Sequence, residues 1–299
     1  MLVTQTPREH PFGVTDLLLF LMAAIWAINF SVVKYATTRF DPVAFMTLRV
    51  VVSAVVLAAI AFTRDLPKLS RETWIRLLLL GVAGHGLYQY FFIIGVSRTR
   101  AGNAALIVAA APAFIAIASR LRGLERVRRL TLAGIALSVA GVAVVILGST
   151  RAVGVGDKAT ALGSLLVFCG VLCWTFFTVG LQPYTRMVDA IQLSAITIIG
   201  GAIPLILITI PQLRHENWTA VGIGGWLALG YASVLSMVLG YLLWYHGLKV
   251  IGATRTAAYS NVQPIIALAV AWIFLGEAPT AWQIVGTGTI VSGIFLTRS

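Results

Sequence analysis

The stretch GVAGHGLYQYFFIIGVSR at residues 81–98 returns in altered form as SVLSMVLGYLLWYHGLKV at residues 233–250. A constant shift of 152 positions carries residues 81–147 onto 233–299 without a gap and pairs Gly95 with Gly247 and Pro112 with Pro264. Glycine and proline constrain the backbone, so these matches indicate a repeated shape and not merely a shared apolar composition.

The repeat extends to the earlier part of the chain at a slightly different shift. Moving that part by 148 positions aligns Trp26 with Trp174 and Asp41 with Asp189. The chain is therefore predicted to consist of two related units, residues 1–149 and residues 150–299.

The composition indicates that both units lie in a membrane. Mean hydropathy is +0.93, and 59% of the residues are hydrophobic against 11% charged, which is outside the usual range of soluble domains. Ten apolar runs can be distinguished, each near the roughly 20 residues that span a bilayer as a helix. They are Asp16–Tyr35, Val43–Thr63, Trp74–Ser97, Ala101–Ser119, Leu130–Ser149, Thr160–Leu181, Ala190–Ile210, Val221–Tyr245, Thr254–Leu275 and Ala281–Thr297.

The expected fold is an all-α membrane protein with ten transmembrane helices in a 5+5 inverted-topology repeat. Five helices per unit force the second unit to enter the membrane from the opposite side. With both termini in the cytoplasm, the cytoplasmic side carries 14 Lys and Arg residues against 7 on the other side, which favours this orientation. The net charge of +12 is concentrated in turns beside the membrane, where it suits anionic lipid headgroups and not nucleic acid.

A set of landmarks carries a resemblance to a known family. The landmarks are Trp26, Asn29, Phe30, Lys34, Asp41, Pro42, Phe45, Arg49, Pro112, Pro264, Leu275, Gly276 and Glu277, followed by a glycine-rich last helix. A ten-helix inverted repeat with these residues resembles the EamA-type members of the drug/metabolite transporter superfamily, and among them the bacterial aromatic amino acid exporters of the YddG type.

The resemblance covers essentially the whole chain. It implies a multi-pass transporter of the bacterial inner membrane whose third, fourth, eighth and ninth helices enclose a central cavity. The first half departs from the second at two places: Leu124-Glu125 is the counterpart of Gly276-Glu277, and Phe177 is the counterpart of Asn29. The two halves are therefore not expected to have identical roles.

Polar and aromatic side chains at helical spacing mark the candidate substrate site. Polar groups in mid-membrane are costly and usually face a cavity or another helix. The third span has a stripe at i, i+3, i+4 and i+7 that begins at His85, and the ninth has a matching stripe that begins at Thr256 and ends beside Pro264. The predicted substrate-binding residues are Trp26, Asn29, His85, Tyr88, Gln89, Phe92, Trp174, Tyr241, Trp244, Tyr259 and Gln263, with Pro112 and Pro264 as hinges. The other interpretation of each is an interhelical hydrogen bond or ordinary packing.

The placement of charge favours facilitated transport. No Asp or Glu falls in the middle of a predicted span, although carboxylate relays usually couple protons to export. His85 is the one group left in mid-membrane that titrates near neutral pH, and Arg49 is expected to pair with carbonyls or to snorkel. A cavity of amides, hydroxyls and rings without strong net charge suits neutral or zwitterionic solutes, foremost aromatic and hydrophobic amino acids. Lipophilic cations are the alternative cargo, through cation–π contacts.

Other classes of function find less support. Gly154 to Asp157 has the GxGD form of intramembrane aspartyl proteases, but it falls in a polar turn and no second membrane-embedded Asp accompanies it. Cys169 and Cys173 lie four apart on one helix and predict neither a disulfide nor a metal site, and no cofactor is expected. Glycines at seven-residue steps in the fifth and tenth spans predict close helix packing, either within a monomer or in a weak homodimer.

Overall fold

The computed structural model describes residues 13–61, 63, 69–123, 129–151 and 158–298. Glu125 and the stretch from Gly154 to Asp157 lie outside the described residues. The first half contains α1 (Val14–Ala36), α2 (Pro42–Ala61), α3 (Arg71–Gly81), η1 (Val82–Leu87), α4 (Tyr88–Arg98), α5 (Ala101–Val108), α6 (Ala111–Leu121) and α7 (Arg129–Arg151). The second half contains α8 (Lys158–Leu181), η2 (Gln182–Arg186), α9 (Ala190–His215), α10 (Gly222–Gly230), η3 (Tyr231–Leu239), α11 (Gly240–Val250), α12 (Ala253–Tyr259), η4 (Ser260–Val262), α13 (Gln263–Leu275) and α14 (Ala281–Arg298).

The described residues are mostly helical, with short non-helical connections, and contain no strand. Seven segments are long and apolar enough to cross a membrane: Val14–Ala36, Pro42–Ala61, Arg71–Arg98, Ala101–Leu121, Ala159–Arg186, Ala190–His215 and Gly222–Val250. Helices also cover the other three predicted runs, as α7, α12 to α13, and α14. The all-helical membrane fold is thus confirmed, whereas the count of ten spans and the side on which the termini lie stay predictions.

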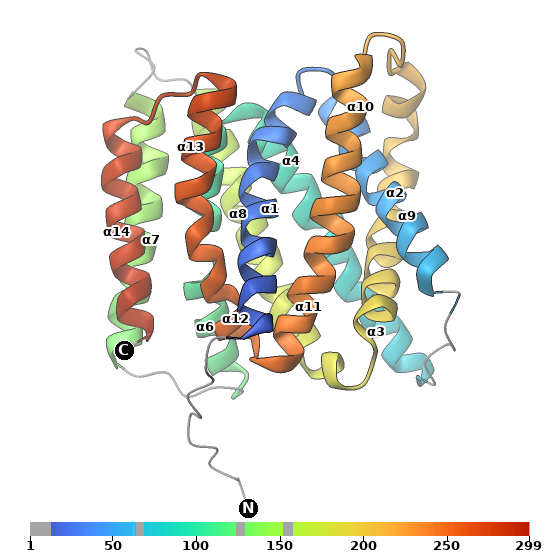
Figure 1. Ribbon diagram of the computed structural model, residues 1–299, viewed down its shortest axis with the longest axis horizontal. Helices are drawn as coiled ribbons and strands as arrows, with labels where there is room; N and C mark the ends of the chain where they lie inside the picture. Colours follow the sequence, from blue (N-terminus) through green and yellow to red (C-terminus); the bar gives the residue numbers. More distant parts are fainter. Residues whose placement is uncertain (1–12, 62, 64–68, 124–128, 152–157, 299) are drawn as a thin grey trace, which may run out of the picture.

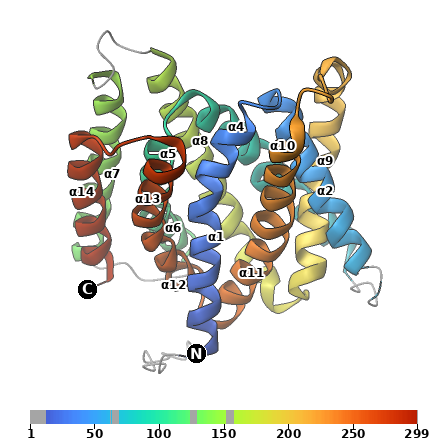
Figure 2. The same cartoon turned by 45° about the horizontal axis from the view of Figure 1, so that its top comes forward.

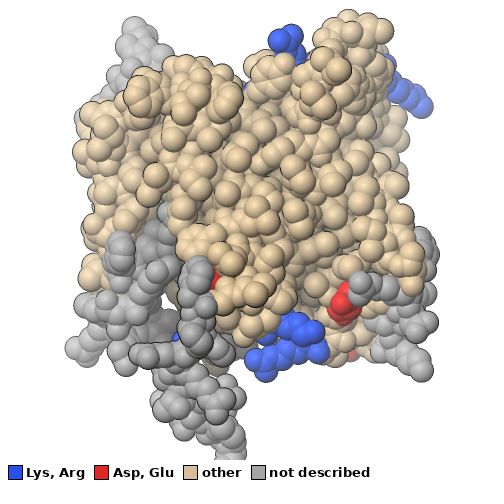
Figure 3. Space-filling model, in the orientation of Figure 1, with Lys and Arg blue, Asp and Glu red and all other residues tan. Residues whose placement is uncertain are grey.

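The helices form one bundle with roughly aligned axes, and the described chain begins and ends at the same end of it (Figure 1). Figure 2, turned by 45°, shows α7 and α14 side by side at one edge, with α2 and α9 toward the other. In the space-filling view, Lys and Arg lie near the two ends of the bundle and uncharged side chains fill the band between them (Figure 3). This distribution fits a protein whose waist is surrounded by hydrocarbon.

The pair α7 and α14 packs through its glycines. A Cβ at Gly293 would lie 2.5 Å from the Gly134 carbonyl oxygen, and one at Gly141 would lie 2.6 Å from the Ile290 side chain. Only glycine permits backbones to approach this closely. The glycine steps are therefore used within one chain, as the packing interpretation predicts, and α7 and α14 stand beside the bundle as a scaffold.

The two halves bend at matching places. The π-helical segments η1 and η3 both interrupt a long helix, and their last residues, Leu87 and Leu239, are 152 positions apart. The next helix of each half is broken just before a proline, at Ala109 to Ala110 ahead of Pro112 and at η4 ahead of Pro264. Proline removes a backbone donor and clashes with the preceding turn, which accounts for these breaks.

Candidate functional site

A small cavity lies in the middle of the bundle, where both pairs of interrupted helices meet α1, α2 and α8. Its volume is about 50 Å³, room for a few waters and well below the roughly 300–1,000 Å³ of ligand pockets. The lining residues are Trp26, Asn29, Phe30, Arg49, Tyr88, Gln89, Phe92, Val108, Ala111, Pro112, Ile115, Val171, Trp174, Ser236, Tyr241, Trp244, Ala257, Ser260 and Gln263.

Aromatic rings from four helices make one wall of this cavity. Trp174 of α8 stands at the centre, with its ring centroid 5.2 Å from that of Tyr88, 5.4 Å from that of Trp244 and 5.8 Å from that of Trp26. The ring of Tyr241 stacks on Trp174 at 5.7 Å and 27°. Each such pair contributes about 0.5–1.5 kcal/mol beyond its buried area, so contacts among the rings stabilise this wall.

Five buried polar atoms around the cavity have no hydrogen-bond partner. Three are donors, namely Arg49 Nη1, Trp244 Nε1 and Gln263 Nε2, and two are acceptors, Asn29 Oδ1 and Gln89 Oε1. A buried polar group without a partner costs about 1–3 kcal/mol. The residues that line the cavity therefore carry several unused donors and acceptors.

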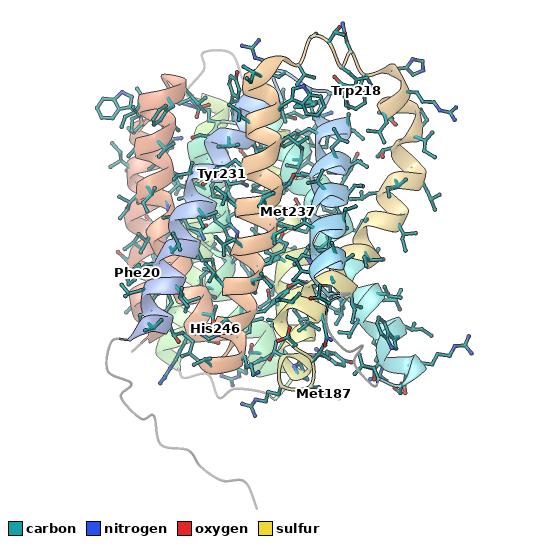
Figure 4. The ribbon with its side chains drawn as sticks, turned by 45° about the vertical axis from the view of Figure 1, so that its right-hand side comes forward. Phe20, Met187, Trp218, Tyr231, Met237 and His246 are labelled. Atoms are coloured by element: carbon teal, nitrogen blue, oxygen red, sulfur yellow. The ribbon has the colours of Figure 1, made fainter. Side chains whose placement is uncertain are left out.

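The π-helical segment η3 fixes the neighbouring helices around the cavity. The Trp26 indole donates to the Ser236 carbonyl oxygen at 2.9 Å, and the Ser53 hydroxyl donates to the Ser233 carbonyl oxygen at 3.0 Å. π-Helical turns change the backbone pairing and occur often at functional sites. Met237, midway along the α10–η3–α11 segment (Figure 4), accepts from Arg49 Nε at 3.3 Å through its sulfur.

The structure brings nine of the eleven predicted substrate-binding residues to the cavity, together with the predicted hinge Pro112. His85 is not among the lining residues. Its Nε2 lies 3.4 Å from both the Tyr245 and the Thr197 hydroxyl oxygens, and its ring packs on Tyr241 at 4.8 Å. His85 therefore contacts the aromatic wall through Tyr241 and does not face the cavity.

Tyr259 also lies away from the cavity, near the end of the bundle at which α1 begins. Its hydroxyl donates to the Asp16 carboxylate and its ring meets Phe20 edge-on at 5.2 Å. Pro264 is buried at the start of α13 but does not line the cavity.

Three polar residues that line the cavity, Arg49, Ser236 and Ser260, are not among the predicted substrate-binding residues, although Ser260 belongs to the stripe that begins at Thr256. Arg49 is 2% exposed and lines the cavity, so it neither snorkels nor bonds to carbonyls as expected. The signal was available, because a basic residue far inside a span seldom faces lipid. Ser236 also lines the cavity, and its backbone carbonyl oxygen accepts from the Trp26 indole, a role that no sequence pattern identifies.

Comparisons with known proteins agree on the family. The model of the EamA-like transporter family matches residues 13–147 and again 161–299. A solved crystal structure superposes with a TM-score of 0.69 at 20% identity, over 95% of this chain and 97% of the other. That likeness concerns the fold.

Three curated relatives match over nearly their full length. The uncharacterized transporter YyaM of Bacillus subtilis is 26% identical over 89% of this chain and 87% of the relative. An uncharacterized transporter of Archaeoglobus fulgidus is 28% identical over 95% and 97%. The probable terminal-alkyne amino-acid exporter of Streptantibioticus cattleyicolor is 23% identical over 93% and 91%.

Proposed function

Because the chain belongs to the EamA-like transporter family, and is a multi-pass membrane transporter rather than an enzyme, we propose that it exports amino acids with aromatic or other apolar side chains across the bacterial inner membrane. The observation that carries this proposal is the set of unpaired donors and acceptors inside an aromatic wall. A zwitterion needs donors for its carboxylate and acceptors for its ammonium group, and an apolar side chain needs rings to pack against. The relative from Streptantibioticus, an exporter of an amino acid by name, supports the same cargo class.

The proposed mechanism is alternating access between two inverted halves. Supporting it are the interruptions at equivalent positions, the π-helical segments and the breaks before Pro112 and Pro264. In such repeats each half adopts the shape of the other as access switches. Residues of these interruptions, such as Pro112 and Ser236, line the cavity, so a change in backbone conformation there would alter the shape of the cavity.

Transport is proposed to be facilitative. Each carboxylate among the described residues lies at a helix end: Asp16, Asp41, Glu72, Asp189, Glu216 and Glu277. Glu277, for example, lies in the connection between α13 and α14 and accepts from the Ala101 backbone N–H at 2.9 Å. Carboxylates at such positions leave the cavity without an acidic proton carrier. The alternative cargo, lipophilic cations, is disfavoured because Arg49 places a positive charge at the cavity.

Counterflow in proteoliposomes tests the proposal. Vesicles loaded with unlabelled phenylalanine should transiently accumulate labelled phenylalanine and leucine, with no pH gradient imposed and not in protein-free vesicles. Gln263→Ala should lower exchange of every amino acid by roughly 5- to 150-fold, because it leaves a substrate polar group unpaired. Absence of counterflow for aromatic and branched amino acids would refute the cargo class, and uptake only under a proton gradient would refute the facilitative mechanism.

A further inference from the structure

Arg49 is a cation buried at the cavity. It is the eighth residue of α2, which places it about 10 Å along the helix from the end, and it is 2% exposed. Transfer of a charged side chain to such depth is expensive unless an opposite charge or several hydrogen bonds accompany it.

The protein supplies very little of that compensation. Arg49 Nε donates to the sulfur of Met237 at 3.3 Å, and a thioether is a weak acceptor without charge. Nη1 has no partner. Across the described ranges, no carboxylate lies within 4.0 Å of the guanidinium; the ion pairs found there join Arg76 to Glu72 and Arg100 to Glu277. The guanidinium also lies over the Phe45 ring, 6.0 Å from its centroid, which is a partial compensation without a negative charge. A negative charge for Arg49 is therefore left for a solute in the cavity to supply.

We propose that Arg49 binds the carboxylate of the transported solute and makes an anionic group a requirement for transport. A guanidinium presents its N–H groups as a planar fork that matches the two oxygens of a carboxylate. The proposal rests on the proposed function only in taking the cavity as the substrate site, and it deepens that function by naming the group that every cargo must carry.

The other unpaired atoms fit this assignment. Trp244 Nε1 and Gln263 Nε2 are further donors at the same cavity, suited to a carboxylate oxygen, while Asn29 Oδ1 and Gln89 Oε1 are acceptors suited to an ammonium group. The anionic end of the solute then meets donors and its cationic end meets acceptors. An amine without a carboxylate leaves Arg49 uncompensated and adds a second positive charge beside it.

The experiment compares phenylalanine with two analogues that keep its ring. 3-Phenylpropionate retains only the carboxylate and phenethylamine only the ammonium group. In wild-type proteoliposomes, we expect phenylalanine and 3-phenylpropionate to compete with labelled phenylalanine. Phenethylamine should need a concentration on the order of tenfold higher, or more, for the same inhibition. Equal competition by phenethylamine would overturn the carboxylate requirement while leaving amino acid transport in place.

Variants identify the residue responsible. Arg49→Gln should lower phenylalanine exchange on the order of tenfold or more and abolish the preference over phenethylamine, while Arg49→Lys should keep the preference at reduced rate because it keeps the charge. Arg98→Gln, which removes an exposed charge at the end of α4, is the matched control and should behave as wild type. An Arg49→Gln protein that keeps the wild-type preference would overturn the assignment.

A binding measurement decides the question even if phenylalanine is not a cargo. In detergent, 3-phenylpropionate should raise the unfolding temperature of the wild-type protein, because a ligand that binds only the folded state stabilises it. Phenethylamine should not, and neither compound should do so in a folded Arg49→Gln variant. Equal shifts for the two compounds in the wild type, or no shift for either, would refute the proposal independently of transport.

Discussion

Replacing Gly240 by alanine should displace one wall of the cavity. A Cβ at Gly240 would lie 2.4 Å from Trp26 Nε1 and 3.2 Å from two further indole carbons, whereas heavy atoms settle at about 3.5–4.0 Å. The indole must therefore retreat by about 1 Å. It cannot do so freely, because its ring lies within 5.8 Å of the ring centroids of Trp174, Tyr241 and Trp244.

The magnitude follows from three contributions. Overpacking of a dense interior costs about 1–3 kcal/mol, and loss of the 2.9 Å hydrogen bond from Trp26 to the Ser236 carbonyl costs about 1 kcal/mol more. Alanine in place of glycine returns up to about 1 kcal/mol of helix propensity. We expect Gly240→Ala to destabilise the protein by about 1–3 kcal/mol and to slow exchange.

Thermal unfolding in detergent and counterflow in proteoliposomes measure the two effects. Gly230→Ala is the matched control, because it lies in the same membrane segment and a Cβ there would meet no atom within 4 Å. The control should be as stable as wild type or slightly more so. If Gly240→Ala unfolds no earlier than Gly230→Ala and exchanges substrate normally, the Trp26 wall is not held as the distances imply.

Gly293→Ala should destabilise the protein while Gly288→Ala should not, since a Cβ at Gly293 would lie 2.5 Å from the Gly134 carbonyl and one at Gly288 would meet nothing; equal unfolding temperatures would argue against α7 and α14 as a rigid scaffold. Pro112→Ala and Pro264→Ala should each slow turnover more than they weaken substrate binding, and unchanged turnover in both would remove these hinges from the mechanism. Trp174→Ala should reduce exchange of tryptophan and phenylalanine more than that of alanine, which uptake of one large and one small amino acid would reveal.

Backbone markers made much of the fold predictable. Proline acts through its own ring, so the alignment of Pro112 with Pro264 located matching helix breaks without any knowledge of packing. The seven-residue glycine steps indicate for a similar reason that the fifth and tenth spans each pack closely against another helix; the structure shows that they pack against each other. These residues act locally, and local effects can be inferred from sequence.

The stripe residues show where that reasoning fails. A helix with 3.6 residues per turn puts His85 on the same face as Tyr88 and Gln89, but η1 covers residues 82–87 and has more residues per turn. The wider turn carries His85 to a position behind the wall. The side chain of Tyr259 also leaves the face expected from regular helical spacing, because α12 ends at that residue and the 3-10 turn η4 follows. Arg49 belongs to no stripe; its depth in the span indicates that it faces the interior of the bundle, but its place at the cavity follows only from the tertiary arrangement.

The cavity of about 50 Å³ is well below the roughly 300–1,000 Å³ of ligand pockets, so we expect loading to move the aromatic rings of its wall apart. Each ring pair that opens forfeits about 0.5–1.5 kcal/mol, and every 1.4 kcal/mol lowers the apparent affinity tenfold. This free-energy cost opposes substrate binding to the empty protein. We therefore expect the transport rate to be low when the solute is scarce and to become appreciable only when the solute is abundant, so that the protein would release an excess.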